Sequence, residues 1–183
     1  MGLNFDCDRP AKNDFTASTI AFCKTLNSFS AAVFYETDKY QNLVPYGDPR
    51  AKIEAHYDIW MDYITSAWTQ RYVFELKERG HNSNSFSTAF INEEKWPAFI
   101  PLRESGIIPM WVELYEDGLI RIWNLKDVDF TSLPLTQKWI KKINIDPNSK
   151  KQLQWRREIS MQSGMTISRI NTKEGDEQRN SKQ

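Results

Sequence analysis

The chain has 183 residues, of which 40% are hydrophobic and 13% aromatic, enough for one domain with a packed core and too many for a wholly disordered protein. Lysine plus arginine and aspartate plus glutamate number 24 each, and this balance argues against a protein that coats nucleic acid non-specifically. The two cysteines, Cys7 and Cys23, lack metal-ligand spacing, so we expect reduced thiols rather than a zinc site or a secreted disulfide scaffold.

The N-terminal part is predicted to contain one helix and one strand. Its first segment, Met1–Pro10, is polar and lacks the apolar stretch of a signal peptide. Residues 14–26 are predicted to form a helix, residues 28–37 a first strand, and residues 38–50, which contain two prolines and a glycine, a loop. No apolar run approaches the ~20 residues of a membrane span. We therefore expect no membrane partner and a cytoplasmic protein, in the host cytoplasm if a phage or mobile element encodes it.

Residues 52–64 alternate between two faces, as expected of a strand. One face is wholly apolar, whereas the other mixes Trp60 with the polar residues Glu54, His56, Asp58 and Asp62. A turn is predicted at residues 65–70. Residues 71–79 are predicted to form the next strand.

A polar loop and a helix are predicted to follow this pair of strands. The loop, Gly80–Ser87, is rich in asparagine and serine. The helix, Glu93–Glu104, has two glutamates in its first turn and two internal prolines, which make it short, kinked or partly 3₁₀. Residues 109–115 and 119–125 are predicted to be strands, joined by the strong hairpin signal Glu116-Asp117-Gly118.

The C-terminal part is predicted to contain a short helix at residues 136–143, a helix or strand at residues 151–160, and a disordered tail from Asn171. The chain thus divides into an N-terminal segment and helix (1–27), a core (28–130), a C-terminal helical and basic extension (131–170) and the tail (171–183). The predicted fold class is α/β with one mixed β-sheet, in the order helix, three strands, helix, two strands.

An antiparallel hairpin of residues 57–64 and 71–79 brings two acidic residues together. With its turn centred near Ser66, residues whose numbers sum to about 133 face each other. Asp58 is then the partner of Glu75. Two carboxylates at the cross-strand distance of about 5 Å repel each other unless a cation lies between them.

These side chains suit a hard divalent cation. Alternation along the strand points Glu75 and Lys77 to one side and Leu76 to the other, into packing. Mg²⁺ takes oxygen ligands, commonly one or two carboxylates with waters and substrate phosphate. A water activated by the ion could hydrolyse a phosphodiester, with Lys77 supporting the nucleophile or the charge of the transition state. The same pattern also fits a solvated ion pair of Glu75 with Lys77.

The stretch from His56 to Leu125 resembles a nuclease superfamily. Its motifs are HYDIWMDYI, RYVFELKERG and INEEKWPAFIPLRESGIIPMWVELYEDGLIRIWNL. They resemble the restriction-endonuclease-like, or PD-(D/E)XK, nucleases, which place a first acid on one strand and (Asp/Glu)-x-Lys on the next, followed by a helix and two strands. The resemblance implies a restriction-endonuclease-like core, with a central mixed β-sheet flanked by helices.

Carried over residue by residue, the resemblance makes Asp58 the first acid, Glu75 the second and Lys77 the catalytic lysine. The implied metal ligands are Asp58, Glu75 and the backbone carbonyl of Leu76, with Mg²⁺ as the ion and Mn²⁺ as a possible substitute. The family's usual proline is replaced by Tyr57. Asp62 lies on the same strand face and is the alternative first ligand.

The implied activity is that of a magnesium-dependent endodeoxyribonuclease, acting on DNA as a junction resolvase, a restriction-type enzyme or a recombination and repair nuclease. Enzymes that cut both strands often pair, so a homodimer is expected as a possibility. Two alternatives stay open: a non-catalytic nucleic-acid-binding or interaction module that retains the fold, and a structural protein of a larger assembly.

Several further residues are candidates for substrate contact, although ordinary hydrogen-bonding or surface roles also fit: His56, Arg79, His81, Ser83, Ser85 and Lys95. Glu113 reads as an edge charge rather than a supporting acid. Four tryptophans are expected in the core: Trp111, Trp123, Trp139 and Trp155. A basic cluster in the C-terminal third fits either DNA phosphates or a solvated helix face: Lys138, Lys141, Lys142, Lys150, Lys151, Arg156 and Arg157.

Overall fold

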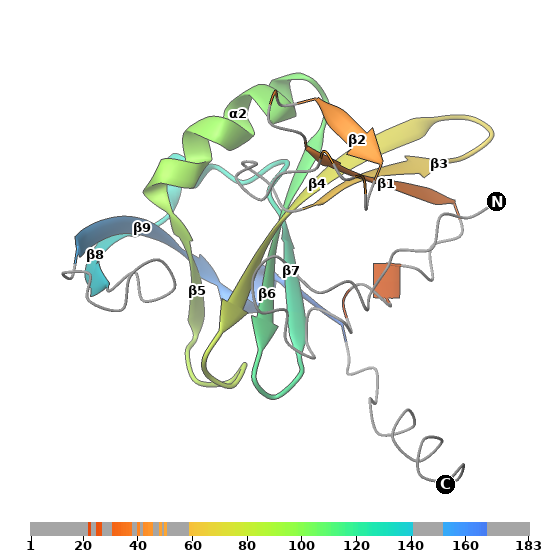
Figure 1. Cartoon of the computed structure of the whole chain (residues 1–183). Helices are drawn as coiled ribbons and strands as arrows, with labels where there is room; N and C mark the ends of the chain where they lie inside the picture. The colour runs from red at the N-terminus through yellow and green to blue at the C-terminus, as the bar shows by residue number, and fades with distance from the viewer. Residues whose placement is uncertain are drawn as a thin grey trace, which may run out of the picture.

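The computed structural model describes residues 22, 25–26, 31–37, 40, 42–45, 48, 50, 59–140 and 152–167. These residues build a mostly β molecule with two sheets and one long helical segment (Figure 1). No helix among them is long and apolar enough to cross a membrane.

The larger sheet has seven strands in the order β10-β7-β6-β4-β3-β1-β2. The strands β4 and β6 pair in parallel and every other neighbouring pair is antiparallel. The bounds are β1 (Ala32–Thr37), β2 (Leu43–Pro45), β3 (Ile59–Ile64), β4 (Thr69–Arg79), β6 (Ile108–Tyr115), β7 (Ile120–Asn124) and β10 (Met165–Ile167).

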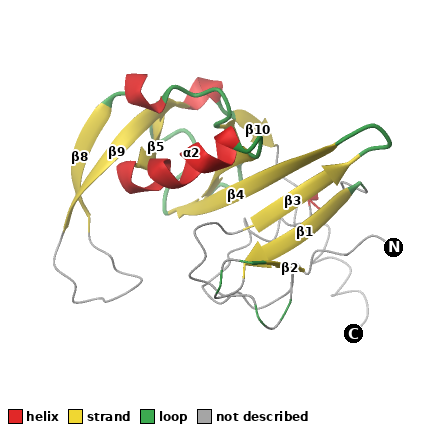
Figure 2. Cartoon of the chain, turned by 90° about the horizontal axis from the view of Figure 1, so that it is seen from above, coloured by secondary structure: helices red, strands yellow, loops and turns green. Residues whose placement is uncertain are grey.

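The smaller sheet is antiparallel, with the order β5-β9-β8, and is built from β5 (Thr88–Asn92), β8 (Leu135–Ile140) and β9 (Gln152–Ser160). Both overall views place β8 and β9 at one side of the molecule and β1 to β3 at the other (Figures 1 and 2). Between β5 and β6 the chain forms the 3₁₀ turn η1 (Glu93–Lys95) and the helix α2 (Trp96–Glu104). Two further 3₁₀ turns are η2 (Phe130–Ser132) and η3 (Met161–Ser163).

Alternation along the central strands sends their side chains into two separate hydrophobic cores. The first core contains Phe74 and Leu76 of β4 together with Phe22, Leu26 and residues of β1, β3, β6 and β7. The second core contains Trp111 and Tyr115 of β6, and lies against α2 and the smaller sheet. The two faces of β4 therefore meet different surroundings, which decides where its charged residues lie.

The predicted register of the central hairpin is confirmed. β3 and β4 pair from Ile59 with Phe74 to Ile64 with Thr69, so the numbers of facing residues sum as predicted. The turn is held by Thr65, whose hydroxyl donates to the Trp68 carbonyl at 2.9 Å. The alternation predicted for residues 52–64 is confirmed over its described part, 59–64, since Ile59 and Met61 are buried in the first core and Tyr63 packs against it. Residues 52–58 lie outside the described residues.

Two other predicted connections are confirmed. Gly118 closes the hairpin between β6 and β7 with a φ of 77°, a left-handed conformation that glycine adopts at low cost. The helical segment runs over Glu93–Glu104 and is partly 3₁₀, with Pro101 inside α2. Asn92 occupies the cap position of η1, but its side chain makes no capping hydrogen bond.

The mixed sheet is confirmed, whereas the expectation that helices flank it is wrong for the described residues. Their single long helical segment is Glu93–Glu104. The helix predicted at residues 136–143 is wrong over its described part, because residues 135–140 form β8. In that strand Leu135, Gln137 and Trp139 share one face, which fits pairing with β9 better than a helical stripe.

Smaller differences concern other strands. The predicted loop at residues 38–50 contains β2, which lies at the edge of the larger sheet. Its last residue is Pro45, and proline, which has no backbone N–H to donate, is tolerated in an edge strand. No helix or strand is predicted from the sequence for Thr88–Ile91, which belong to β5. Residues 152–160 form the strand β9, which is one of the two structures predicted for that segment, and β10 joins the larger sheet. The described part of the extension that was expected to be helical therefore consists mainly of strands.

Several predictions fall wholly or partly outside the described residues. Of the predicted helix at 14–26, only Phe22, Thr25 and Leu26 are described, and they are helical. Cys7, Cys23 and the tail from Asn171 lie outside the described residues.

Candidate active site

Glu75 is the centre of a charged cluster on the second face of β4. Glu75 is buried, with 3% of the residue exposed. Lys77, two positions further along the strand, forms an ion pair with Glu75 Oε1. Lys95 Nζ lies 2.8 Å from the same oxygen. One buried carboxylate oxygen therefore has two ammonium groups as partners, which gives the cluster a net positive charge.

The fold positions these three side chains from two elements. Because β4 alternates, Glu75 and Lys77 share one face, while Leu76 between them is buried in the first core, as predicted. Lys95 comes from η1, at the start of the crossover from β5 to β6. Trp111 is the ladder partner of Glu75, and its ring centroid lies 5.7 Å from Lys77 Nζ.

The burial of the cluster is uneven. The Glu75 side chain is 4% exposed, whereas the side chains of Lys77 and Lys95 are 31% and 26% exposed. The carboxylate is thus held inside the protein, and its two amines reach solvent. An anion that approaches from solvent meets the ammonium groups first.

Asp62, the alternative first acid, is held elsewhere on the sheet. Arg71 donates to both of its carboxylate oxygens at 2.6 Å, and the two residues are direct ladder partners. The hydrogen bond to Asp62 raises the pKa of Arg71. Arg71 lies four residues before Glu75 on β4, which is roughly 13 Å of strand. The preferred first acid, Asp58, and the neighbouring His56 lie outside the described residues.

Glu113 is a second buried acid on the same face. It is 1% exposed, and it accepts hydrogen bonds from Arg79, from Trp111 Nε1 at 3.1 Å and from the Tyr115 hydroxyl at 2.6 Å. Burial, and next the hydrogen bond to Glu113, raises the pKa of Tyr115, so its hydroxyl remains a donor. The interpretation of Glu113 as an edge charge is wrong, because all three donors surround it inside the second core.

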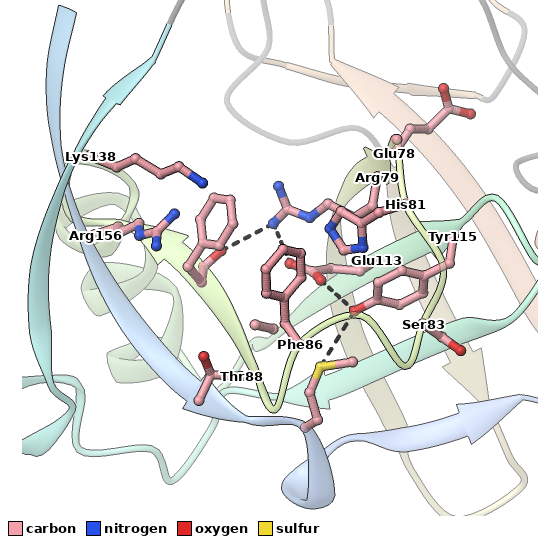
Figure 3. A pocket seen from close by; sticks show the side chains of 14 residues that line it. Glu78, Arg79, His81, Ser83, Phe86, Thr88, Glu113, Tyr115, Lys138 and Arg156 are labelled. Atoms are coloured by element: carbon pink, nitrogen blue, oxygen red, sulfur yellow. Dashed lines mark hydrogen bonds and ion pairs between the residues drawn. The ribbon is translucent and has the colours of Figure 1, made fainter.

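Three of the predicted substrate-contact residues line one cavity of about 290 Å³ at the end of β4: Arg79, His81 and Ser83 (Figure 3). Ser83 is also engaged in the fold, since its hydroxyl donates to Asp117 at 2.7 Å. Ser85 is exposed and is not among the lining residues. Lys95 lies apart from them in the Glu75 cluster.

The smaller sheet contributes to this cavity, and the sequence pattern gave no sign of that role. Lys138 of β8 and Arg156 of β9 close one side of it, although the sequence showed them only as members of a dispersed basic cluster. Arg157, next in sequence, instead pairs with Glu93. Phe86, from the loop predicted to be polar, also lines the cavity.

The tryptophan predictions divide between the two sheets. Trp111 and Trp123 are 1% exposed and belong to the second core, as predicted. Trp139 and Trp155 are 63% and 48% exposed, so their predicted core positions are wrong. The second core includes residues of β5 and Ile159 of β9. The two exposed rings lie on parts of β8 and β9 that extend beyond this core.

Among residues that the structure describes, no group of three histidine, cysteine, aspartate or glutamate side chains is placed to hold a metal ion. Glu75 supplies an oxygen donor of the kind that Mg²⁺ prefers, and Mg²⁺ requires only one or two carboxylates. Among the described residues of the cluster, the implied ion would thus have only the Glu75 carboxylate as a ligand, and the further predicted ligand, Asp58, lies outside the described residues.

Comparison with known proteins gave no match: no family model fits the chain, and no curated protein or solved structure is similar to it. The resemblance to the PD-(D/E)XK nucleases thus rests on the sequence motifs alone.

Proposed function

We propose that this protein is a magnesium-dependent deoxyribonuclease with Glu75 and Lys77 in its reaction centre and Asp58 as the first acid. The observation that carries the proposal is the convergence of Lys77 and Lys95 on the buried carboxylate of Glu75. A carboxylate beside ammonium groups that reach solvent is the donor set expected where a divalent ion and a phosphate meet.

The arrangement of the elements supports a restriction-endonuclease-like core. The hairpin of β3 and β4 precedes the helix α2, and the strands β6 and β7 follow it. The helical crossover returns β6 beside β4 in parallel, so that the Glu-x-Lys strand lies at the centre of the sheet. This order is the one that the motifs imply, with β5 as an addition.

The residues of the cluster have distinct roles in this proposal. Mg²⁺, when bound, would activate a water and offset the charge of the scissile phosphate. Glu75, with Asp58, would hold the ion. Lys77 would orient the attacking water and support the charge that develops on it, and Lys95 would stabilise the charge on the phosphate oxygens.

The proposal is tested by cleavage of supercoiled plasmid and of labelled duplex, single-stranded and branched DNA, with Mg²⁺ or Mn²⁺. The variants are Glu75→Gln, Lys77→Ala and Asp58→Asn, with Lys126→Ala as the matched control, because Lys126 is an exposed lysine beyond β7. We expect each site variant to cut at least about 100-fold more slowly, the scale of losing one charged catalytic group. Circular dichroism verifies that each variant is folded.

Intact DNA with the wild-type protein under all these conditions would reject the proposal, as would site variants that cut at the wild-type rate. A homodimer remains part of the proposal, and light scattering with and without DNA measures it.

A second candidate is a non-catalytic nucleic-acid-binding module with the same fold. The two ion pairs of Glu75 Oε1 favour this candidate, because a carboxylate with two ammonium partners within the protein also fits a purely structural ion cluster. Such a module would retard DNA in a gel without cutting it. Its binding would also be unaffected by Asp58→Asn.

A further inference from the structure

The cavity at the end of β4 differs from the Glu75 cluster in shape and chemistry. It is formed where the loop after β4 meets the smaller sheet, and it combines cationic with aromatic side chains (Figure 3). Arg79 lies four residues after Glu75 on the same strand face, roughly 13 Å along β4. The cavity is therefore a neighbour of the proposed reaction centre and not a part of it.

The cationic side of the cavity comes from the smaller sheet. Lys138 is exposed, and no carboxylate of the described residues lies within ion-pair distance of it. Arg156 lies beside it, but Glu158 pairs with Arg156 at 3.6 Å. Figure 3 shows both cationic side chains reaching in from this side. Lys138 is thus the group with charge left for a ligand.

The aromatic side comes from the loop after β4 and from β6. Phe86 is 58% exposed, and its ring lies 4.8 Å from that of His81 in an edge-to-face arrangement. His81 in turn contacts Tyr115, with 5.6 Å between the ring centroids. An exposed phenylalanine steadied by a second ring is a surface on which a planar group stacks.

The deeper wall is already neutralised. Arg79 pairs with the buried Glu113, and it also donates to the Phe90 carbonyl at 3.2 Å. The guanidinium carbons of Arg79 and Arg156 each lie 4.2 Å from the centroid of the Phe90 ring. These contacts stiffen the wall, so Lys138 and Phe86 are the parts of the cavity that are available to a ligand.

We infer that this cavity binds one unpaired nucleotide of a DNA strand, with its phosphate at Lys138 and its base against Phe86. The inference rests on the proposed function for its choice of nucleic acid. A volume of about 290 Å³ suits a small ligand, and the pairing of a cation with an exposed ring is the means by which proteins bind single strands. The enzyme would then prefer substrates with an unpaired or frayed end near the cut.

The test measures binding by fluorescence anisotropy in EDTA, where cleavage cannot interfere. The probes are a labelled single-stranded oligodeoxynucleotide and the blunt duplex of the same sequence, with Phe86→Ala, Lys138→Ala and the control Lys126→Ala. Both cavity residues are exposed, so these variants should fold. We expect tighter binding of the single strand, about tenfold weaker binding with Phe86→Ala, and a smaller salt dependence with Lys138→Ala.

Competition identifies the ligand. A deoxynucleoside monophosphate should displace the single strand at concentrations where inorganic phosphate does not. Equal displacement by phosphate would reduce the cavity to a simple anion site and overturn the inference, as would wild-type binding by both cavity variants. Because the binding assay needs no cleavage, a protein that binds the single strand in EDTA but leaves DNA intact with Mg²⁺ or Mn²⁺ would reject the proposed nuclease and leave the nucleotide site standing.

Discussion

The two faces of β4 and β6 belong to the same strands but differ in chemistry, because the first face is apolar and the second adds buried charges to an aromatic core. On the first face Phe74, Leu76, Val112 and Leu114 are buried together in an apolar core. Burial of such side chains stabilises the fold by about 1.5–3 kcal/mol each and requires no particular partner. This face explains why the sheet forms.

On the second face the same strands bury Glu75 and Glu113 beside lysine and arginine. Taking a charge out of water costs several kcal/mol, and an ion pair recovers this only in part. A buried pair is therefore weak evidence for stability. The buried charges of the second face therefore lower the stability of the fold instead of raising it, and for this reason we place the chemistry on that face.

The largest effect is expected from breaking the Glu113 pair. Arg79→Met leaves the Glu113 carboxylate buried without its cation, so the free energy of unfolding should fall by about 4 kcal/mol. Urea unfolding followed by fluorescence measures this change.

The double variant Arg79→Met/Glu113→Gln supplies the control. An amide still accepts hydrogen bonds from Trp111 and Tyr115 but needs no counter-charge, so the double variant should be more stable than Arg79→Met alone. A double variant whose loss equals the sum of the single losses would contradict the view that charge dominates this face.

The apolar face should respond differently, and by somewhat less. Leu76→Ala should lower the free energy of unfolding by about 3 kcal/mol, because it leaves a cavity in the first core. Leu76→Met keeps the volume and should cost less than about 1.5 kcal/mol. Leu114 lies in the same apolar core and is not among the implied metal ligands, so Leu114→Met should cut DNA at the wild-type rate. A large loss of cleavage in that folded variant would mean that the two faces are not independent.

The sequence was informative where local rules determine the structure. The register of β3 and β4 follows from the short turn and from strict alternation, so the pairing of Ile59 with Phe74 could be predicted. The turn between β6 and β7 could be predicted because Gly118 adopts a positive φ. Both features depend only on residues close together in the chain.

The sequence was misleading where distant residues determine the structure. The six residues of β8 are too few for their spacing to distinguish a helix from a strand, and the pairing with β9 decides between them. Likewise Glu113 is buried because Arg79, from another strand, neutralises it. The approach of Lys95 to Glu75 depends on how the crossover folds back, so the sequence alone favoured a surface lysine.

The smallest single effects are expected in the Glu75 cluster, where each lysine can substitute for the other. Lys77→Met or Lys95→Met should lower the free energy of unfolding by about 1 kcal/mol, because one ammonium still neutralises the carboxylate. The double variant should lose about 1 kcal/mol more than the sum, since Glu75 is then buried without a cation. Lys126→Met is the exposed control and should have no effect.

The same variants separate stability from chemistry. If the roles proposed for the two lysines are correct, Lys77→Met should lose cleavage far beyond its loss of stability, and Glu75→Gln should relieve the instability of the double variant without restoring cleavage. Strictly additive losses of stability in the Lys77→Met/Lys95→Met protein would mean that the two amines do not share one carboxylate in solution. The convergence on Glu75 would then no longer support a reaction centre on this face.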